Sequence, residues 1–352
     1  MGEKVLMKGN EAIGEAAIRS GCRHFFGYPI TPQTELSAYM AKKMPKINGV
    51  FLQAESEVSA INMVYGAAAA GMRTMTSSSS PGISLKAEGI SYLAAGDLPC
   101  VIVNIVRGGP GLGGIQPAQS DYFQAVKGGG HGDYHLIVLA PNSVQELAHL
   151  TAEAFNISDE YRIPTMILGD GTLGQMMEPV DLDAIPEPIY ADKPWAARGT
   201  DNKRKKNVVE TLYLEASEIE KKVLEREEKY NVVKENLQRY EAHDIDDADI
   251  IISSYGITSR VVETAVKSLR EEEIKVGVIR PITLWPFPEK IFKTVKPKAF
   301  WSVEMSTGQM IEDIKLACEC SAPVYFCGRT GGIIPTPDEV AEKVKSIMKE
   351  VQ

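Results

Sequence analysis

Short, almost continuous apolar runs alternate with helix-like segments along this chain, and this alternation constrains the fold more than any other feature. The clearest run covers residues 99–106, and similar runs cover residues 136–141 and 164–168. Segments of helical character, among them residues 83–95 and 143–156, lie between the runs. A strand that is apolar along its whole length is buried on both faces, as happens when helices cover both sides of a parallel sheet. The pattern therefore predicts an α/β fold.

Two α/β units are expected, separated by a charged segment. The first predicted domain covers residues 1–190, and prolines at positions 179, 186 and 188 mark its exit. Residues 191–245 are strongly charged with scattered apolar positions, which is typical of a solvent-exposed helical linker. A second, smaller domain is expected over residues 246–352. Its strands are predicted at residues 249–253, 276–279, 299–303 and 324–326.

The composition of the chain argues against several classes of function. A formal net charge of −9 disfavours nucleic acid and anionic membranes as partners. No apolar run is long enough to span a bilayer and the first residues do not resemble a signal peptide, so a cytoplasmic location is predicted. The cysteines include Cys318, Cys320 and Cys327, but their spacing matches neither a zinc nor an iron–sulfur motif. No metal site is therefore predicted in this chain.

Residues 53–71 place two acids, Glu55 and Glu57, at the start of a helix rich in small residues. Acids in a first helical turn complement the helix dipole, and this is a sufficient reason for either of them. A carboxylate at the mouth of an apolar helix can also hydrogen-bond a buried polar ligand. The small residues around Gly66 would let a neighbouring element pack closely. This segment by itself is compatible with both interpretations.

Two glycine motifs suggest cofactor sites that their surroundings do not support. Residues 109–114 match the G-x-G-x-x-G pattern of an NAD-dependent dehydrogenase. That pattern requires a long apolar helix directly afterwards, whereas the next residues are polar and interrupted by Pro117. A mobile glycine-rich loop over an active site fits better. Asp170, between Gly169 and Gly171, is interpreted as a turn residue at the end of a strand.

Four further features occur together: the run Tyr28-Pro29-Ile30-Thr31-Pro32, the acid Glu57, residues 74–81, and Arg107. Taken together they resemble the 2-oxoacid:ferredoxin oxidoreductases, a family of thiamine diphosphate enzymes. The chain is similar to the α subunit of these enzymes over essentially its whole length. The resemblance implies a thiamine-diphosphate-binding, pyrimidine-type doubly wound domain followed by a transketolase-C-terminal-like α/β domain.

The glycine-rich loops indicate which member of the family the chain resembles. Residues 108–113 and 127–134 look most like the branched-chain, ketoisovalerate type. The 2-oxoglutarate type is similar but differs in this loop. Residues 280–288 and 304–309 match the second domain of the family.

The resemblance also implies a role for individual residues. In this superfamily the acid that activates the cofactor lies nine residues before a helical glycine, and counting back from Gly66 identifies Glu57. Glu57 would hydrogen-bond the pyrimidine ring of thiamine diphosphate, which favours removal of the thiazolium proton. Thr31 would contact the carboxylate or carbonyl of the substrate. Arg107 would clamp the carboxylate, because a guanidinium fork matches that planar group.

Other residues of the same loops are expected to complete the site. Pro29 and Ile30, together with Thr31, would contact the cofactor. His131, in a glycine-rich loop, is a further candidate for substrate contact. Thr31 and Arg107 follow predicted strands, and open α/β sheets bind their ligands at the carboxyl ends of strands.

The resemblance implies that the chain supplies part of an enzyme. A β subunit would bind the diphosphate and Mg²⁺, a δ subunit would carry two [4Fe-4S] clusters, and a γ subunit would add another domain. Coenzyme A would be a co-substrate, and ferredoxin would accept the electrons. The active site would then lie at the interface between α and β.

The favoured interpretation is CoA-dependent oxidative decarboxylation of a branched-chain 2-oxoacid such as 2-ketoisovalerate. The same chemistry on 2-oxoglutarate or another 2-oxoacid is one alternative. A non-catalytic scaffold that retains an inactive pyrimidine domain is another.

Overall fold

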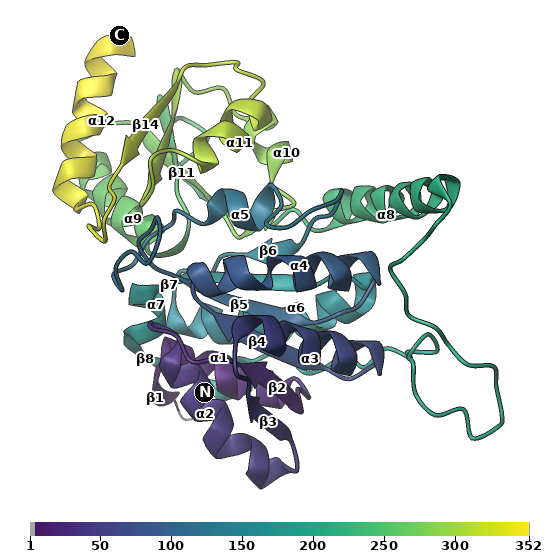
Figure 1. Ribbon diagram of the computed structural model, residues 1–352. Helices are drawn as coiled ribbons and strands as arrows, with labels where there is room; N and C mark the ends of the chain where they lie inside the picture. Colours follow the sequence, from purple (N-terminus) through teal and green to yellow (C-terminus); the bar gives the residue numbers. More distant parts are fainter. Residues whose placement is uncertain (1–3, 352) are drawn as a thin grey trace.

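The computed structural model describes residues 4–351 and contains two sheets of mainly parallel strands, each covered by helices (Figure 1). The strands of the larger sheet are β2 (His24–Gly27), β3 (Val50–Gln53), β4 (Thr74–Ser78), β5 (Val101–Val106), β6 (Ile137–Leu139), β7 (Thr165–Asp170) and β12 (Thr283–Trp285). Their spatial order is β12-β6-β7-β5-β4-β2-β3, and every neighbouring pair except β12–β6 is parallel.

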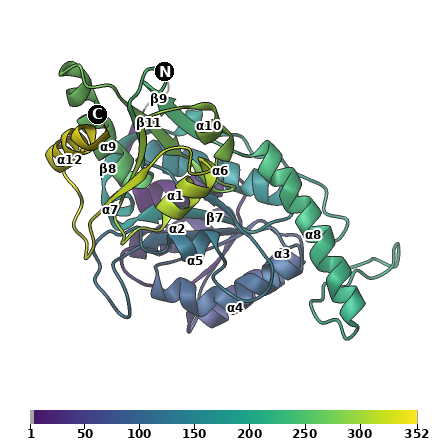
Figure 2. The same ribbon diagram turned by 90° about the horizontal axis from the view of Figure 1, so that it is seen from above.

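Helices cover both faces of this sheet. They are α1 (Gly9–Arg19), α2 (Thr34–Lys43), η1 (Met44–Ile47), α3 (Glu57–Ala69), α4 (Pro81–Ala95), α5 (Tyr122–Val126), α6 (Val144–Tyr161), α7 (Gly171–Gln175) and η2 (Leu182–Ala184). Figure 2 shows α3 and α4 on one side of the sheet and α1 and α6 on the other. The central strands β4, β5 and β7 are buried at every position. The predicted α/β class is therefore confirmed, and the apolar runs are continuous because helices bury these strands on both faces, as expected.

The smaller sheet is built from the C-terminal part of the chain. Its strands are β9 (Tyr240–His243), β10 (Ile250–Ser253), β11 (Val276–Pro281), β13 (Ala299–Glu304) and β14 (Val324–Gly328), in the order β14-β13-β10-β11-β9. The helices of this part are α9 (Gly256–Glu271), α10 (Glu289–Thr294), α11 (Met310–Ala317) and α12 (Pro337–Val351). Side chains alternate along β10, because Ile250 and Ile252 join one apolar core with Trp301 whereas Ile251 joins the other.

The two sheets are connected by more than the chain between them. Strand β12 lies within the predicted second domain, yet it pairs with β6 at the edge of the larger sheet. Arg280 on β11 donates to both carboxylate oxygens of Glu146 in α6, at 2.9 and 2.8 Å. The short helix α5 lies between the two sheets (Figure 1), and the Tyr122 hydroxyl donates to Asp313 of α11. The boundaries proposed at residues 190 and 245 stay a prediction, although β12, from the predicted second domain, completes the sheet of the first.

The predicted charged linker takes two forms. Residues 185–215 are an extended arm without helix or strand, and α8 (Ala216–Asn236) then forms a long rod (Figure 1). Arg226, Tyr230 and Val233 are the residues that α8 buries, so most of its surface faces solvent. Strands β1 (Lys4–Lys8) and β8 (Met177–Asp181) form a separate antiparallel ribbon. Over residues 4–351, no helix is both long enough and apolar enough to cross a bilayer.

Candidate active site

The predicted site residues come from loops at one edge of the larger sheet. Thr31 follows β2, Glu57 begins α3 after β3, and Arg107 follows β5. Because these strands are parallel members of one sheet, their carboxyl ends lie at the same edge. The serines that follow β4 lie between them in the strand order. The sheet therefore gathers residues that are far apart in the sequence.

Glu57 is a buried carboxylate without a hydrogen-bond partner. It is the first residue of α3 and is 6% exposed. Ser56 caps the helix instead, since its hydroxyl accepts a hydrogen bond from the Ser59 N–H at 3.2 Å. Within residues 4–351 no hydrogen bond reaches the Glu57 side chain. The neighbouring Glu55 is exposed, so the two acids differ as the sequence predicts.

Gly82 in the first turn of α4 lets the Glu57 side chain approach. A Cβ at Gly82 would lie 2.8 Å from the Glu57 Oε1 and 2.0 Å from the Ser78 Oγ. A side chain there would displace both groups. The hydroxyls of Ser78 and Ser79 are buried and also have no partner among the described residues. Buried polar groups are normally hydrogen-bonded, so these three side chains are available to a ligand.

Arg107 is held by backbone contacts and lacks a carboxylate partner among the described residues. It is 7% exposed, and its Nη1 and Nη2 donate to the carbonyl oxygens of Thr31 and Leu112 at 2.9 and 3.0 Å. Its Nε has no partner. Thr31 and Arg107 are therefore brought into direct contact. A guanidinium bonded only to neutral carbonyls can exchange them for a carboxylate, which forms stronger, charge-assisted hydrogen bonds.

The backbone at Arg107 is fixed by Ser80, at the turn between β4 and α4. The Arg107 N–H donates to the Ser80 Oγ at 3.1 Å, and that hydroxyl donates to the Arg107 carbonyl at 3.2 Å. Ser80 has φ +20, unusual for a non-glycine residue, and its N–H donates to the Asn104 Oδ1 at 3.1 Å. The Asn104 amide donates in turn to Asp121 at 2.9 Å, and burial raises the pKa of the Asp121 carboxyl. Asn104 is the polar residue of an otherwise apolar strand, a signal that can be read in the sequence.

The glycine-rich loop after Arg107 closes on itself. Arg107 and Pro117 form an antiparallel bridge at its base, and the Gly114 N–H donates to the Gly108 carbonyl at 2.9 Å. Gly113 has φ +59, and a Cβ there would lie 1.8 Å from the Gly108 oxygen. The next helix, α5, has five residues. The long helix that a dinucleotide site needs is not present after this motif in the described chain, which weakens the dehydrogenase alternative.

The remaining predicted residues lie in different places. Pro29 and Ile30 share the loop of Thr31. This loop is fixed at the Pro32 carbonyl, which accepts hydrogen bonds from the side-chain amides of Asn10 and Gln175 at 2.8 and 2.9 Å. His131 lies apart, against Tyr92 in the second half of α4. Tyr92 is eleven residues beyond Pro81, or about 16 Å along a helix. The structure does not bring His131 to the other three residues, so its role in substrate contact remains a prediction without geometric support.

Lys86 is a residue of this region that sequence reasoning missed. Its side chain is fully buried under the start of α4, and its Nζ donates to the Thr76 Oγ1 at 2.8 Å and the Ser77 carbonyl at 2.9 Å. Burial lowers the pKa of Lys86 to about 7, and the charge of Glu57 acts in the opposite direction. The available signal was its position in the apolar stripe of α4, three residues after Ile83 and four before Ile90.

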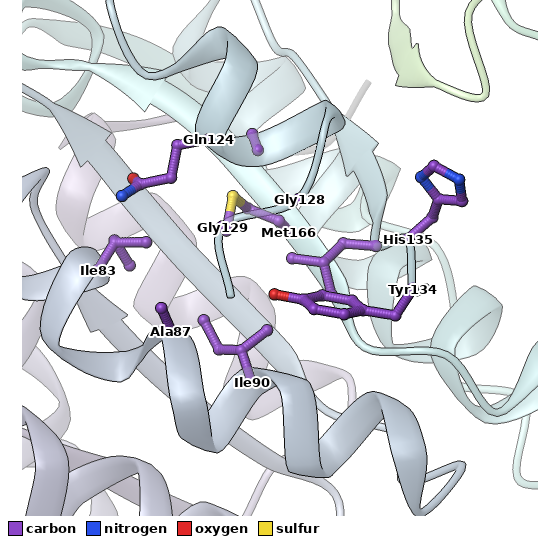
Figure 3. A pocket seen from close by; sticks show the side chains of 11 residues that line it. Ile83, Ala87, Ile90, Gln124, Gly128, Gly129, Tyr134, His135 and Met166 are labelled. Carbon is purple, nitrogen blue, oxygen red and sulfur yellow. The ribbon is translucent and has the colours of Figure 1, made fainter. Parts of the chain in front are cut away.

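Two cavities flank these residues. The first lies under α4, is lined mainly by apolar side chains and has room for about one water molecule, with a volume of about 10 Å³ (Figure 3). It contains none of the predicted site residues and is too small for a 2-oxoacid. The second is an open cleft of about 840 Å³ between the larger sheet and the loop after β13. Ser80, Gly108, Asp121 and Thr307 are among its lining residues, so it adjoins the backbone of Arg107.

Comparison with known proteins agrees with this geometry. Residues 15–262 match the family described as pyruvate flavodoxin/ferredoxin oxidoreductase, thiamine diphosphate-binding, and residues 248–340 match pyruvate:ferredoxin oxidoreductase core domain II. The ketoisovalerate oxidoreductase subunit VorB of Methanothermobacter marburgensis is 48% identical, with 98% of each chain covered. The 2-oxoglutarate synthase subunit KorA of Methanocaldococcus jannaschii is 35% identical, over 96% of this chain and 98% of that one.

A solved structure shares the whole fold. It is the 2-oxoglutarate:ferredoxin oxidoreductase from Magnetococcus marinus with 2-oxoglutarate, coenzyme A and succinyl-CoA bound. The superposition has a TM-score of 0.89 at 30% identity and covers all of this chain. This chain spans 66% of the length of the chain in that structure.

Proposed function

This chain belongs to the pyruvate flavodoxin/ferredoxin oxidoreductase family, and from that premise we propose that it is the α-type subunit of a complex that oxidises 2-ketoisovalerate. The reaction would be 2-ketoisovalerate + CoA + two oxidised ferredoxins → isobutyryl-CoA + CO₂ + two reduced ferredoxins + H⁺. The substrate is supported by the 48% identity to a ketoisovalerate oxidoreductase subunit, compared with 35% to a 2-oxoglutarate synthase subunit.

The observation that carries this proposal is the unpartnered Glu57 carboxylate beside Gly82. A buried acceptor with no protein donor fits the ring nitrogen N1′ of a pyrimidine, with which it can share a proton. The buried hydroxyls of Ser78 and Ser79 supply further free polar groups at the same place. When bound, thiamine diphosphate supplies the carbon nucleophile and the electron sink that decarboxylation requires.

The other two residues would bind and orient the substrate. The Arg107 guanidinium would exchange the Thr31 and Leu112 carbonyls for the substrate carboxylate, and Thr31 would contact the carboxylate or the adjacent carbonyl. Pro29 and Ile30 would contact the cofactor through the same loop. Holding the 2-oxoacid in one orientation is worth several kcal/mol of the barrier, because the entropy of positioning is lost at binding rather than in the reaction.

A partner chain would complete the site. Exposed apolar side chains occur on the elements that carry Glu57 and Arg107: Leu52 on β3, Val58 on α3, Leu85 on α4, and Leu112 and Ile115 in the loop after Arg107. An exposed apolar rim of this kind is typical of a protein interface. We assign to it a β-type subunit that binds the diphosphate and Mg²⁺. Among residues 4–351 no group of three or more His, Cys, Asp or Glu side chains could hold a metal ion.

The remaining parts of the enzyme are also proposals. A δ-type subunit with two [4Fe-4S] clusters would pass electrons to ferredoxin, a γ-type subunit would add a further domain, and the complex would work in the cytoplasm. The names of the relatives describe them as subunits, which supports a heteromeric assembly.

The test is a matched pair of variants in the reconstituted complex. Glu57→Gln should lower kcat by about a thousandfold, because a neutral amide cannot share a proton with the ring nitrogen and so cannot stabilise its protonated form. The melting temperature should stay close to that of the wild type, since the side chain makes no hydrogen bonds in the described protein. Glu55→Gln, two residues away and exposed, is the control and should retain turnover. Turnover by Glu57→Gln close to that of the wild type would disprove the assignment.

The substrate is tested separately. We expect kcat/KM to be highest for 2-ketoisovalerate when 2-ketoisovalerate, pyruvate and 2-oxoglutarate are compared. A preference for 2-oxoglutarate would favour the second candidate, which the 35% identity to a 2-oxoglutarate synthase subunit supports.

A further inference from the structure

Lys86 is a buried ammonium group that the proposed reaction does not use. Its side chain is fully buried, and its hydrogen bonds go to one hydroxyl and one backbone carbonyl of β4. No ion pair to Lys86 occurs within 4.0 Å among residues 4–351. A buried charge without a counter-charge is costly, so the chain must either compensate it or leave the amine neutral.

Glu57 is the acid that faces Lys86. It begins α3, which packs on α4 so closely that a Cβ at Gly89 would lie 2.5 Å from the Ile61 side chain. Gly82 lies one helical turn before Lys86, and a Cβ at Gly82 would lie 2.8 Å from the Glu57 Oε1. The charge of Glu57 opposes the effect of burial on the pKa of the Lys86 amine. Strand β4, to which the ammonium is hydrogen-bonded, carries no titratable side chain, and Glu88 of α4 bonds instead to the exposed Tyr92 hydroxyl.

The same ammonium supports the loop that carries Thr31. The Ser77 carbonyl accepts a hydrogen bond from the Lys86 Nζ, and the Ser77 hydroxyl donates to the Gln33 Oε1 at 2.7 Å. The Gln33 amide then donates to the Tyr28 carbonyl at 3.2 Å. Lys86 is therefore hydrogen-bonded to the end of β4, which leads into the turn at Ser80 and which is linked through Gln33 to the loop that carries Thr31.

We propose that Lys86 is a positioning residue whose ammonium is the counter-charge of the Glu57 carboxylate before the cofactor binds, and that it gives up its proton when a cofactor ring nitrogen shares one with Glu57. This rests on the proposed function, because it takes Glu57 as the residue that meets the cofactor. One proton leaves Lys86 for solvent and one is taken up at the ring nitrogen. The net charge of the site is therefore the same before and after binding.

The measurement is the number of protons exchanged when thiamine diphosphate binds to the reconstituted complex in the presence of Mg²⁺. Calorimetric titrations near neutral pH in two buffers of different ionisation enthalpy give this number without any turnover. Lys86→Gln keeps a hydrogen-bond donor and removes the charge, whereas Lys86→Met removes both. We expect both variants to take up about half to one proton more per cofactor than the wild type, because no Lys86 proton is released.

Lys229→Gln is the matched control. Lys229 is partly buried, with its side chain 24% exposed, and its Nζ donates to Asp97 and to the Arg162 carbonyl at the α8 surface. It should exchange the same number of protons as the wild type. If Lys86→Gln matches the wild type while Lys86→Met differs, Lys86 acts through hydrogen bonds alone and the proposal is wrong. Equal numbers in all variants would overturn it as well.

Glu57→Gln separates this proposal from the proposed function and covers the case in which the Lys86 variants fail to fold. In that variant no proton leaves Lys86 and none is taken up at the ring nitrogen, so the proton number should be close to zero at every pH. In the wild type Lys86 is largely protonated at about pH 6 and already neutral at about pH 9, so net proton uptake should rise by about half to one proton per cofactor between these two pH values. If Glu57→Gln abolishes turnover but the wild type exchanges the same number of protons at both pH values, the proposed function stands and the role of Lys86 does not. If Glu57→Gln turns over normally, the proposed function itself fails.

Discussion

Two buried acids occupy similar places in the two sheets, and their surroundings differ completely. Glu304 ends β13 in the smaller sheet, is fully buried, and accepts hydrogen bonds from the Ser302 and Ser306 hydroxyls at 2.7 and 2.8 Å. The backbone N–H groups of Gln309, Met310 and Ile311 donate to it as well. Glu57, at the start of α3 beside the larger sheet, accepts none in the described protein. One carboxylate therefore orders the start of a helix, and the other has no hydrogen-bond donor among the described residues.

Two buried arginines differ in the same way. Arg280 is 1% exposed, and its guanidinium donates to both oxygens of Glu146 and to Glu241. Arg107 donates to two backbone carbonyls and leaves its Nε free. Buried charges that serve stability are paired and fully hydrogen-bonded, because an unpaired one is costly. The groups at the edge of the larger sheet are incompletely paired, which is what a binding site requires at the expense of stability.

The largest effect is expected at Arg107. Arg107→Met should lower kcat/KM for the 2-oxoacid by about a thousandfold, because under the proposed function the buried guanidinium would pair with the substrate carboxylate. Arg107→Lys should recover only part of this loss, since an ammonium lacks the bidentate fork. Steady-state kinetics of the reconstituted complex would measure both. The comparison would break if Arg107→Met unfolded the chain but left kcat/KM of the folded fraction unchanged.

The next effect concerns stability and should appear at Glu304. Glu304→Gln should lower the free energy of unfolding by about 3 kcal/mol, because five donors lose a charged acceptor and an amide adds donors of its own. Glu57→Gln should change it by less than about 1 kcal/mol. Denaturant unfolding of the purified variants measures the difference. Equal destabilisation by the two substitutions would mean that Glu57 also serves the fold.

A smaller, pH-dependent effect is expected from Lys86. Burial lowers its pKa to about 7 in the folded chain, whereas the ordinary value for a lysine is 10.5. Between these two pH values the unfolded chain therefore binds one more proton than the folded chain. Stability must then rise with pH in this window. From about pH 7 to 9, the wild type should gain about 2 kcal/mol relative to Lys86→Met, as measured by denaturant unfolding at each pH. Parallel curves for the two proteins would show that the Lys86 amine titrates normally.

Local sequence was enough to identify much of the fold and the polar groups at its edge. The continuous apolar runs correctly indicated β5 and β7, because a strand that is buried on both faces needs apolar side chains at consecutive positions. The register from Gly66 separated Glu57 from Glu55, and the structure finds the first buried and the second exposed. The positions of Thr31 and Arg107 at strand ends predicted their meeting, and they are in contact. Their chemical roles remain predictions.

Tertiary structure decided what depends on pairing between distant segments. Nothing local in residues 283–285 reveals that β12 joins the larger sheet, or that β1 pairs with β8, because a strand does not carry the identity of its partner. The partners of Lys86 on β4 and the position of His131 beside Tyr92 were likewise set by the packing of distant segments. Periodicity specifies an element and its buried face, whereas the neighbours of that face are set by the packing of the whole chain.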